Sequence, residues 1–183
     1  TLVAGEVPSA TLFHGVAFGF SPETLLLSDP GKLAGTLPLS LRYLIAPAAT
    51  PLTSVAFLAD GKGIVTGGAD KIVRLWNPVD GTEVRQFPGH TDVVTSVAVT
   101  HDGTQIVAGA VDKTVRIWKT ADAAVVATLT QTAAVRSLAL SADSSRLAVT
   151  GDTGLLRVWD LATGKSLQRF AGHEGVVGAV SFG

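Results

Sequence analysis

Short apolar runs separated by polar turns dominate the chain from residue 50 onwards. Between residues 89 and 118 there are three of them, Val93–Val99, Gln105–Ala110 and Thr114–Trp118, and Val, Ile and Thr are common in them. These residue types are enriched in β-strands. An Asp-Gly dipeptide at 102–103 separates the first two runs, and this dipeptide is a strong signal for a β-hairpin. The pattern therefore predicts an antiparallel meander of short strands.

The same pattern occurs three times along the chain. The tryptophans at 76, 118 and 159 follow one another at intervals of 42 and 41 residues, and the turn aspartates at 60, 102 and 143 keep the same intervals. An Arg lies two positions before each Trp, and Gly-His pairs occur at 89–90 and 172–173. Four marks in one register predict a repeated unit of four strands. The predicted strands are Ser54–Leu58, Gly63–Gly67, Ile72–Trp76 and Glu83–Phe87; Thr95–Val99, Gln105–Ala110, Thr114–Trp118 and Ala124–Leu129; Val135–Leu140, Arg146–Thr150, Leu155–Trp159 and Ser166–Phe170; and Val176–Phe182.

The chain resembles the WD-repeat β-propeller family in its repeat length, its Gly-His pairs and its tryptophans. The resemblance covers residues 50–183 and is specific for a fold, not for a function. It implies an all-β partial propeller of four-stranded antiparallel blades at 50–88, 89–130 and 131–171, with the first strand of a further blade at 172–183. Residues 1–49 are expected to form divergent N-terminal strands or a decayed blade, because Pro38 stands where the third strand of that unit would run.

In this family a buried hydrogen-bond chain joins a His, a Ser or Thr, an Asp and the Trp of each blade. The indole N–H only donates, a carboxylate only accepts, and a hydroxyl or an imidazole can do both. Together these groups can satisfy one another's hydrogen bonds in such a chain. The resemblance places in it Thr66, Asp70 and Trp76; His90, Asp112 and Trp118; Thr150, Asp152 and Trp159; and His173. Ala108 replaces the hydroxyl residue of the second blade, Thr132 stands at the His position of the third, and a one-residue deletion shifts the third acid to Asp152.

Composition narrows the functional classes. Of 183 residues, 46% are hydrophobic and 16% charged, which is a globular balance, and the net charge of −1 argues against broad attraction to nucleic acid or anionic membrane. There is no Cys, so disulfides and thiolate metal sites are excluded. No apolar run has the length of a transmembrane helix. The N-terminus lacks a signal-peptide pattern, and both ends are expected to be cuts within a longer protein.

Two chemical interpretations of the polar residues compete with the structural one. His90 and Asp112 as a base pair, with Thr95 or Ser96 as nucleophile, would make a hydrolase. A metal site would draw on the four histidines, at 14, 90, 101 and 173. Because the same residue types recur with the repeat, they are assigned to the fold, and no catalytic residue, metal or cofactor is expected. Arg74, Arg116 and Arg157 are interpreted as stems that cover apolar surface, with an anion-binding or peptide-binding ring as the alternative.

The resemblance implies a non-catalytic scaffold that binds a protein or peptide through the loops between strands. The loop positions proposed for this contact are Thr91, Asp92, Ala69 and Val111, and they carry no large aromatic or Arg anchor. The other expected partners are the remaining blades of the same propeller or a second copy of the chain. Two alternatives stay open: a sensor or docking propeller attached to a bacterial multidomain enzyme or cytochrome-type protein, and a propeller hydrolase.

Overall fold

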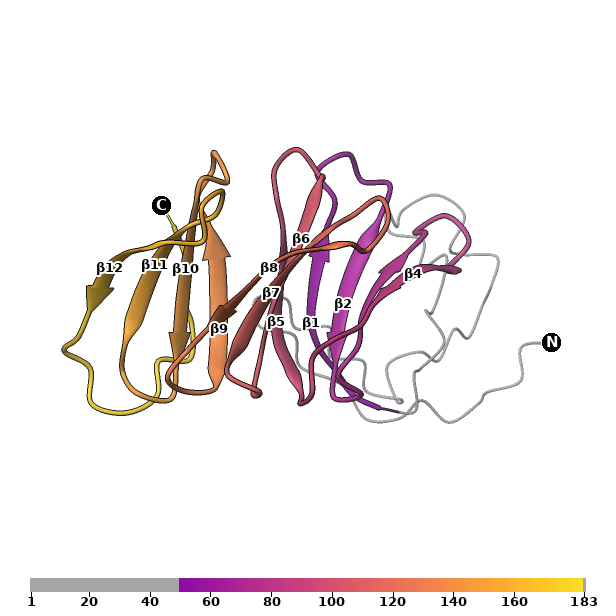
Figure 1. Ribbon diagram of the computed structural model, residues 1–183. Helices are drawn as coiled ribbons and strands as arrows, with labels where there is room; N and C mark the ends of the chain where they lie inside the picture. The colour runs from indigo at the N-terminus through magenta and orange to yellow at the C-terminus, as the bar shows by residue number, and fades with distance from the viewer. Residues whose placement is uncertain (1–49, 183) are drawn as a thin grey trace, which may run out of the picture.

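The computed structural model describes residues 50–182, and they form three four-stranded antiparallel sheets (Figure 1). The strands are β1 (Leu52–Phe57), β2 (Ile64–Gly68), β3 (Val73–Trp76) and β4 (Glu83–Phe87); β5 (Val94–Val99), β6 (Gln105–Ala110), β7 (Thr114–Lys119) and β8 (Val125–Thr130); and β9 (Val135–Leu140), β10 (Arg146–Gly151), β11 (Leu156–Asp160) and β12 (Ser166–Phe170). The twelve predicted strands from residue 54 to residue 170 are confirmed, with ends shifted by at most two residues.

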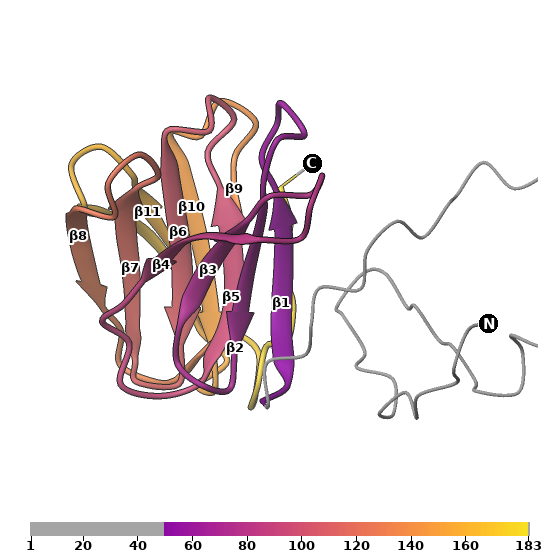
Figure 2. The same ribbon diagram turned by 90° about the vertical axis from the view of Figure 1, so that its right-hand side faces the viewer.

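Each sheet is a meander whose strands follow one another in chain order. The three sheets stand side by side, with β1, β5 and β9 as neighbours along the inner side and β4, β8 and β12 as the outer strands (Figures 1 and 2). Bulges interrupt the pairing of each outer strand at the tryptophan of its neighbour, at Trp76, Trp118 and Trp159. The three sheets are thus copies of one design, as the sequence repeat predicts.

Side chains on the inner strands join one sheet to the next. Ser54 Oγ accepts the backbone N–H of Val97 at 3.0 Å, and Ser96 Oγ accepts that of Leu138 at 3.3 Å. Thr95 donates its hydroxyl to the carbonyl of Val135 at 2.8 Å, and Thr53 donates to the corresponding carbonyl of the second sheet. These bonds repeat with the period of the sequence, so they set a fixed spacing between sheets.

Apolar side chains between the sheets form two buried clusters, one between the first and second sheets and one between the second and third. In the first cluster Phe87 of β4 meets Trp118 of β7 edge to face, with 6.1 Å between ring centroids. Aromatic pairs favour this geometry, and both side chains are fully buried. Trp118 therefore covers the outer strand of the preceding sheet, and Trp159 shares the other cluster with Leu129 of β8.

Two glycines allow this close approach. A Cβ on Gly67 would lie 2.5 Å from Val94 Cγ1, and a Cβ on Gly109 would lie 2.4 Å from Val135 Cγ1. Atoms cannot approach so closely without shifting one strand. A larger residue at either position would therefore push the next sheet away.

One predicted strand is wrong. Residues 171–182 run without strand structure, although Val180 donates its backbone N–H to Ser137 Oγ at 3.3 Å and Val177 donates its own to the carbonyl of Gly151 at 3.2 Å. The segment thus follows the inner face of β9 in the way that β9 follows β5. A strand needs a ladder of backbone partners, and the described part of the chain contains none for this segment. The decayed blade expected within residues 1–49 lies outside the described residues.

Candidate functional site

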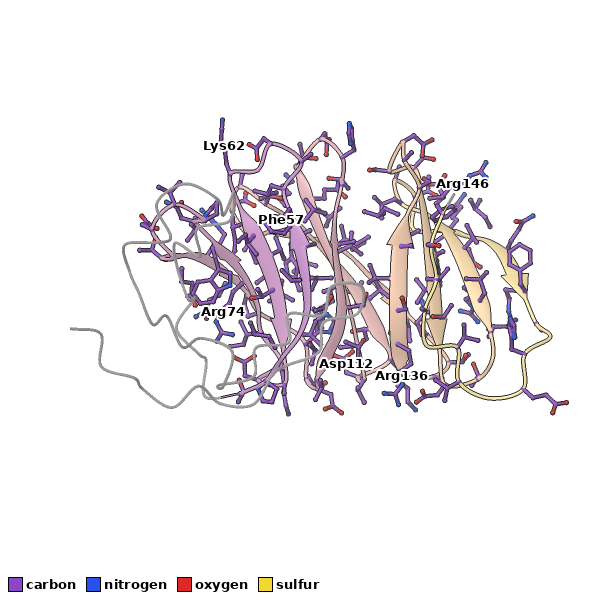
Figure 3. All side chains as sticks on the ribbon, turned by 180° about the vertical axis from the view of Figure 1, so that it is seen from behind. Phe57, Lys62, Arg74, Asp112, Arg136 and Arg146 are labelled. Carbon is purple, nitrogen blue, oxygen red and sulfur yellow. The ribbon has the colours of Figure 1, made fainter. Side chains whose placement is uncertain are left out.

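The strand connections gather at two opposite ends of the sheets. One end, here called the loop face, carries the turns that follow β2, β6 and β10 and the links that enter β5 and β9. Figure 3 shows Asp112 and Arg136 at this end, and Lys62 and Arg146 at the other. The four loop residues proposed for partner contact all belong to segments of the loop face: Ala69, Thr91, Asp92 and Val111.

His90 and Asp112 form a buried pair at the loop face. His90 precedes β5, Asp112 lies in the turn between β6 and β7, and 2.9 Å separates Nδ1 from Oδ2. The side chain of His90 is 0% exposed and that of Asp112 is 7% exposed. Asp112 also accepts the backbone N–H groups of Thr91 and Thr114, both at 2.9 Å. The pair therefore ties the link before β5 to the turn after β6.

Burial decides the charge of this pair. Desolvation lowers the pKa of His90 below its ordinary value of 6.5, and the opposing effect of the hydrogen bond that His90 donates to Asp112 does not overcome it. For Asp112, burial acts to raise the pKa, but hydrogen bonds from Thr114, Thr91 and His90 outweigh it and hold the pKa low. At neutral pH the pair is a neutral imidazole that donates Nδ1–H to a carboxylate, which leaves Nε2 as an acceptor.

The tryptophans differ in what their indole nitrogens contact. Trp76 Nε1 donates to Thr66 Oγ1 at 2.7 Å. Trp118 Nε1, Trp159 Nε1 and His90 Nε2 are buried and have no hydrogen-bond partner within residues 50–182. The hydroxyl that served Trp76 is thus missing in the other two sheets.

The strand registers show which residues replaced it. Thr66 pairs with Arg74 across β2 and β3, and the residues in the same place are Ala108, opposite Arg116, and Val149, opposite Arg157. The assignment of Thr150 to the hydroxyl position is therefore wrong by one residue. Successive residues of a strand point to opposite faces, so Thr150 is directed away from Trp159, and its hydroxyl donates to the carbonyl of Ser137 at 3.4 Å.

The acid of the third sheet is shifted in the same way. Lys71, Lys113 and Gly154 have positive φ values of 71°, 66° and 67°, which marks one shared turn position. The residue directly before this turn position is Asp70 in the first sheet, Asp112 in the second and Thr153 in the third. Asp152 corresponds to Ala69 and Val111 instead, so its assignment to the buried chain is corrected.

Asp152 contacts a neighbour on the inner strand. Arg136 donates to both carboxylate oxygens, with 3.0 Å between Nη2 and Oδ2, and both side chains are partly exposed. This hydrogen-bonded contact lowers the pKa of Asp152 and raises that of Arg136. In the repeat, Arg136 of the third sheet corresponds in position to Thr53 of the first and Thr95 of the second. The two threonines donate a hydroxyl hydrogen bond to the next sheet, whereas Arg136 forms an ion pair with Asp152.

The remaining polar residues take separate roles. Gln131, not Thr132, precedes β9 by the interval at which His90 precedes β5, and its side-chain nitrogen is buried without a partner among the described residues. His173 is exposed. Asp70 binds Arg74, which also donates to Glu83 Oε2 at 2.9 Å. These residues do not extend a single hydrogen-bond chain through the blades.

The three arginines beside the tryptophans act within separate sheets. Arg74 is held by the two carboxylates of the first sheet, and Arg157 lies over the ring of Trp159, 5.6 Å from its centroid. Arg116 packs so close to Gly89 that a Cβ there would lie 2.9 Å from Nη1. The three arginines thus have separate partners.

An open groove of about 960 Å³ runs along the inner strands of all three sheets. Its lining mixes small polar and aliphatic side chains with one cation, Arg136, and it includes the loop residue Val111. The hydroxyls of Thr95 and Ser96 are already engaged in bonds between sheets, and the structure shows no bond from either to His90. Residues 50–182 contain no group of three His, Asp or Glu side chains arranged to hold a metal ion, and no helix that is long and apolar enough to cross a membrane.

Comparison with known families identifies the repeat. A family model described as "WD domain, G-beta repeat" matches residues 40–77, 81–119 and 124–160, which is more than half of the chain. The chain belongs to the WD40 repeat family. The resemblance drawn from the tryptophan and Gly-His spacing is confirmed. The WD40 fold is characteristic of scaffolds for protein–protein interaction.

Solved structures agree on the fold of this WD40 chain. It superposes on structures titled "Structure of U3-55K" and "Crystal structure of RRP9 WD40 repeats", each with a TM-score of 0.73 and 22% sequence identity. The alignments cover 76% of this chain but only 45% and 44% of those chains. The WD40 chain therefore spans less than half the length of these neighbours. A search of curated proteins finds no match.

Proposed function

We propose that this WD40 chain is a non-catalytic scaffold that binds a protein or peptide at the loop face, including the end of the inner groove that Arg136 lines. The observation that carries the proposal is the groove itself, because it is concave, mixed in polarity and continuous across three sheets. An extended peptide has backbone donors and acceptors along its whole length. Ser54 and Ser96 each accept one backbone N–H of the next sheet, which leaves their O–H groups to donate to a ligand carbonyl, and the aliphatic lining suits the ligand's apolar side chains.

The distribution of the polar residues supports a binding role over a hydrolytic one. Catalysis by His90 would need a nucleophile within hydrogen-bond reach of a ring nitrogen. Nδ1 is directed at Asp112, and Nε2 is enclosed with the ring of Trp118, at 5.6 Å between centroids. The Thr114 hydroxyl lies 3.3 Å from Nδ1, but it donates to Asp112 Oδ1 at 2.7 Å, so His90 does not act as its base. A fully buried imidazole of this kind serves the fold.

We infer further that the rest of a complete propeller comes from a longer chain or from a second copy. The support is the match to less than half of each neighbouring structure, together with the outer face of the third sheet. There Phe170 is 49% exposed, whereas the corresponding Phe87 is 0% exposed beneath Trp118. No blade covers Phe170 within the described part of the chain.

Paired surface variants test the loop-face proposal. Ala69→Arg combined with Thr91→Arg enlarges the loop face without removing a side-chain hydrogen bond, and Ala59→Arg combined with Ala142→Arg makes the same charge change at the opposite end. Partners captured by the wild-type chain are purified, and their affinity is measured by titration calorimetry. The first pair should weaken binding by about tenfold or more, and the second should not. Equal loss in both pairs, or retention in both, contradicts the assignment of the loop face.

A further inference from the structure

The outer strands of the three sheets have unequal protection along their free edges. An edge strand offers unpaired backbone groups to other chains, and natural proteins protect such edges with charge or proline. Strand β4 carries Glu83 and Arg85 and is followed directly by Pro88, and β12 carries Arg169. Each of these two edges therefore has a protective residue.

Strand β8 has no such protection. No charged residue and no proline occurs from residue 123 to residue 135, and β8 itself reads Val-Val-Ala-Thr-Leu-Thr. Val125 and Val126 are 54% and 46% exposed. The strand is hydrogen-bonded only to β7 and lies at the outer margin of its sheet (Figure 2). Four of its six residues are β-branched, a composition that favours further strand pairing.

The free backbone groups of β8 can be located from its register. Gln131 donates its N–H to the carbonyl of Lys113 at 2.8 Å, and Thr130 lies opposite Thr114. Because antiparallel pairs alternate between hydrogen-bonded and non-hydrogen-bonded, Thr128 and Thr130 direct their N–H and C=O groups away from β7. Both residues are exposed.

Comparison of the registers shows that position 128 is where the other edges differ. Thr128 lies opposite Arg116, and the corresponding outer residues are Gln86, opposite Arg74, and Arg169, opposite Arg157. The third sheet thus has a charge at the very position where β8 has a threonine. Beyond it, Thr130 corresponds to Pro88, which has no N–H to donate.

We propose that β8 is a self-pairing edge, on which a second copy of the chain docks with its own β8, antiparallel about a two-fold axis. Centring the axis on Leu129 places Thr128 opposite Thr130 of the other copy, so both outward-facing residues exchange backbone bonds and form cross-strand threonine pairs. The pairing is self-complementary because neither strand has a charge to desolvate, and a net charge of −1 per copy gives little repulsion. Strand pairing alone buries a small area, so a weak dimer with a Kd in the micromolar range is expected.

Sedimentation velocity on matched variants tests this pairing. Thr128→Arg introduces at β8 the residue that the third sheet already tolerates in the same place, and Gln86→Arg makes the equivalent change on β4. Wild-type chain is compared with both from about 1 to about 200 µM. Thr128→Arg should raise the dimer Kd by at least about tenfold, while Gln86→Arg should leave it within about twofold. Amide hydrogen exchange should show concentration-dependent protection at Thr128 and Thr130.

Three results would overturn the proposal. The first is a wild-type chain that stays monomeric over the whole range. The second is an equal effect of the two arginine variants. The third is a dimer that disappears when residues 176–183 are deleted, since that would place the contact at the third sheet. The loop face takes no part in this pairing, so loss of partner binding and loss of dimerisation are separate outcomes.

Discussion

Thr66 accepts the indole N–H of Trp76 at 2.7 Å, and this bond has no counterpart in the other two sheets of the described chain. Ala108 and Val149 stand in the place of Thr66, so the indole nitrogens of Trp118 and Trp159 are buried without an acceptor. A buried donor that loses its partner costs about 1–3 kcal/mol relative to a satisfied one. The second and third blades therefore carry a defect that a single hydroxyl could repair.

Ala108→Ser should stabilise the chain. The new hydroxyl would accept from Trp118 Nε1 and donate to His90 Nε2, which satisfies two orphaned atoms with one group, and the expected gain is about 1 kcal/mol in the free energy of unfolding. Urea denaturation provides the measurement. Ala148→Ser is the control, because Ala148 is buried on the opposite face of its strand, and burying an unpaired hydroxyl there should cost about 1–3 kcal/mol. Destabilisation by both substitutions would refute the repair.

Val149→Thr should stabilise the third blade for the same reason. Thr has nearly the shape of Val, so the packing around Trp159 is kept. A buried hydroxyl normally costs stability, but here it accepts the unpartnered indole N–H of Trp159. The matched control is Val107→Thr, since Val107 is fully buried and occupies the opposite strand face. Thermal unfolding should show a higher Tm for Val149→Thr and a lower Tm for Val107→Thr. A lower Tm in both variants would show that the hydroxyl does not reach the indole.

Asp112→Ala should destabilise the chain more than Asp102→Ala. Asp112 is buried with His90 and accepts hydrogen bonds from Thr91 and Thr114. Its removal leaves these donors without an acceptor, and each unpaired buried donor costs about 1–3 kcal/mol. Asp102 accepts from Thr100 and Thr104 in an exposed turn, where water can replace it. Trp118 contributes nothing to this difference, because Asp112 does not contact its indole nitrogen. Equal shifts in urea midpoint would contradict the two roles.

Stability should fall as the pH drops below about 6.5, and His90 is the cause. Burial lowers the pKa of His90 in the folded chain below its ordinary value of 6.5. Between these two values the unfolded chain binds a proton that the folded chain rejects, so unfolding is favoured as pH falls. The contribution of His90 is fully present above pH 6.5 and is lost progressively down to the lowered folded value.

His90→Gln provides the test of this pH dependence. Glutamine does not titrate, and Gln131 shows that the fold accommodates it at the corresponding place before β9. Urea midpoints measured from pH 8 to pH 5 should decline more steeply for the wild-type chain than for the variant. Identical slopes for the wild-type chain and His90→Gln would remove the buried imidazole from the explanation.

Local patterns in the sequence were sufficient for the twelve strands between residues 52 and 170, for their order and for their grouping into three four-stranded sheets. Alternation of apolar side chains and Asp-Gly turns depend on a few neighbouring residues, and the tryptophan period is visible directly along the sequence. These patterns are therefore readable without a structure. His90 and Asp112 could also be paired in advance, because both occupy fixed places in the repeat.

Only the tertiary structure decided how the third blade is registered against the other two. A shift of one residue moves a strand side chain to the opposite face, and the sequence does not show where the missing residue of the third repeat was lost. The sequence therefore predicts Thr150 and Asp152 as members of the buried hydrogen-bond chain. In the structure Val149 and Thr153 stand at the two corresponding positions, and Asp152 pairs with Arg136 instead. Tertiary structure also decided that residues 176–182 do not form a strand. A sequence with strand character forms a strand only where a neighbouring strand supplies backbone hydrogen-bond partners.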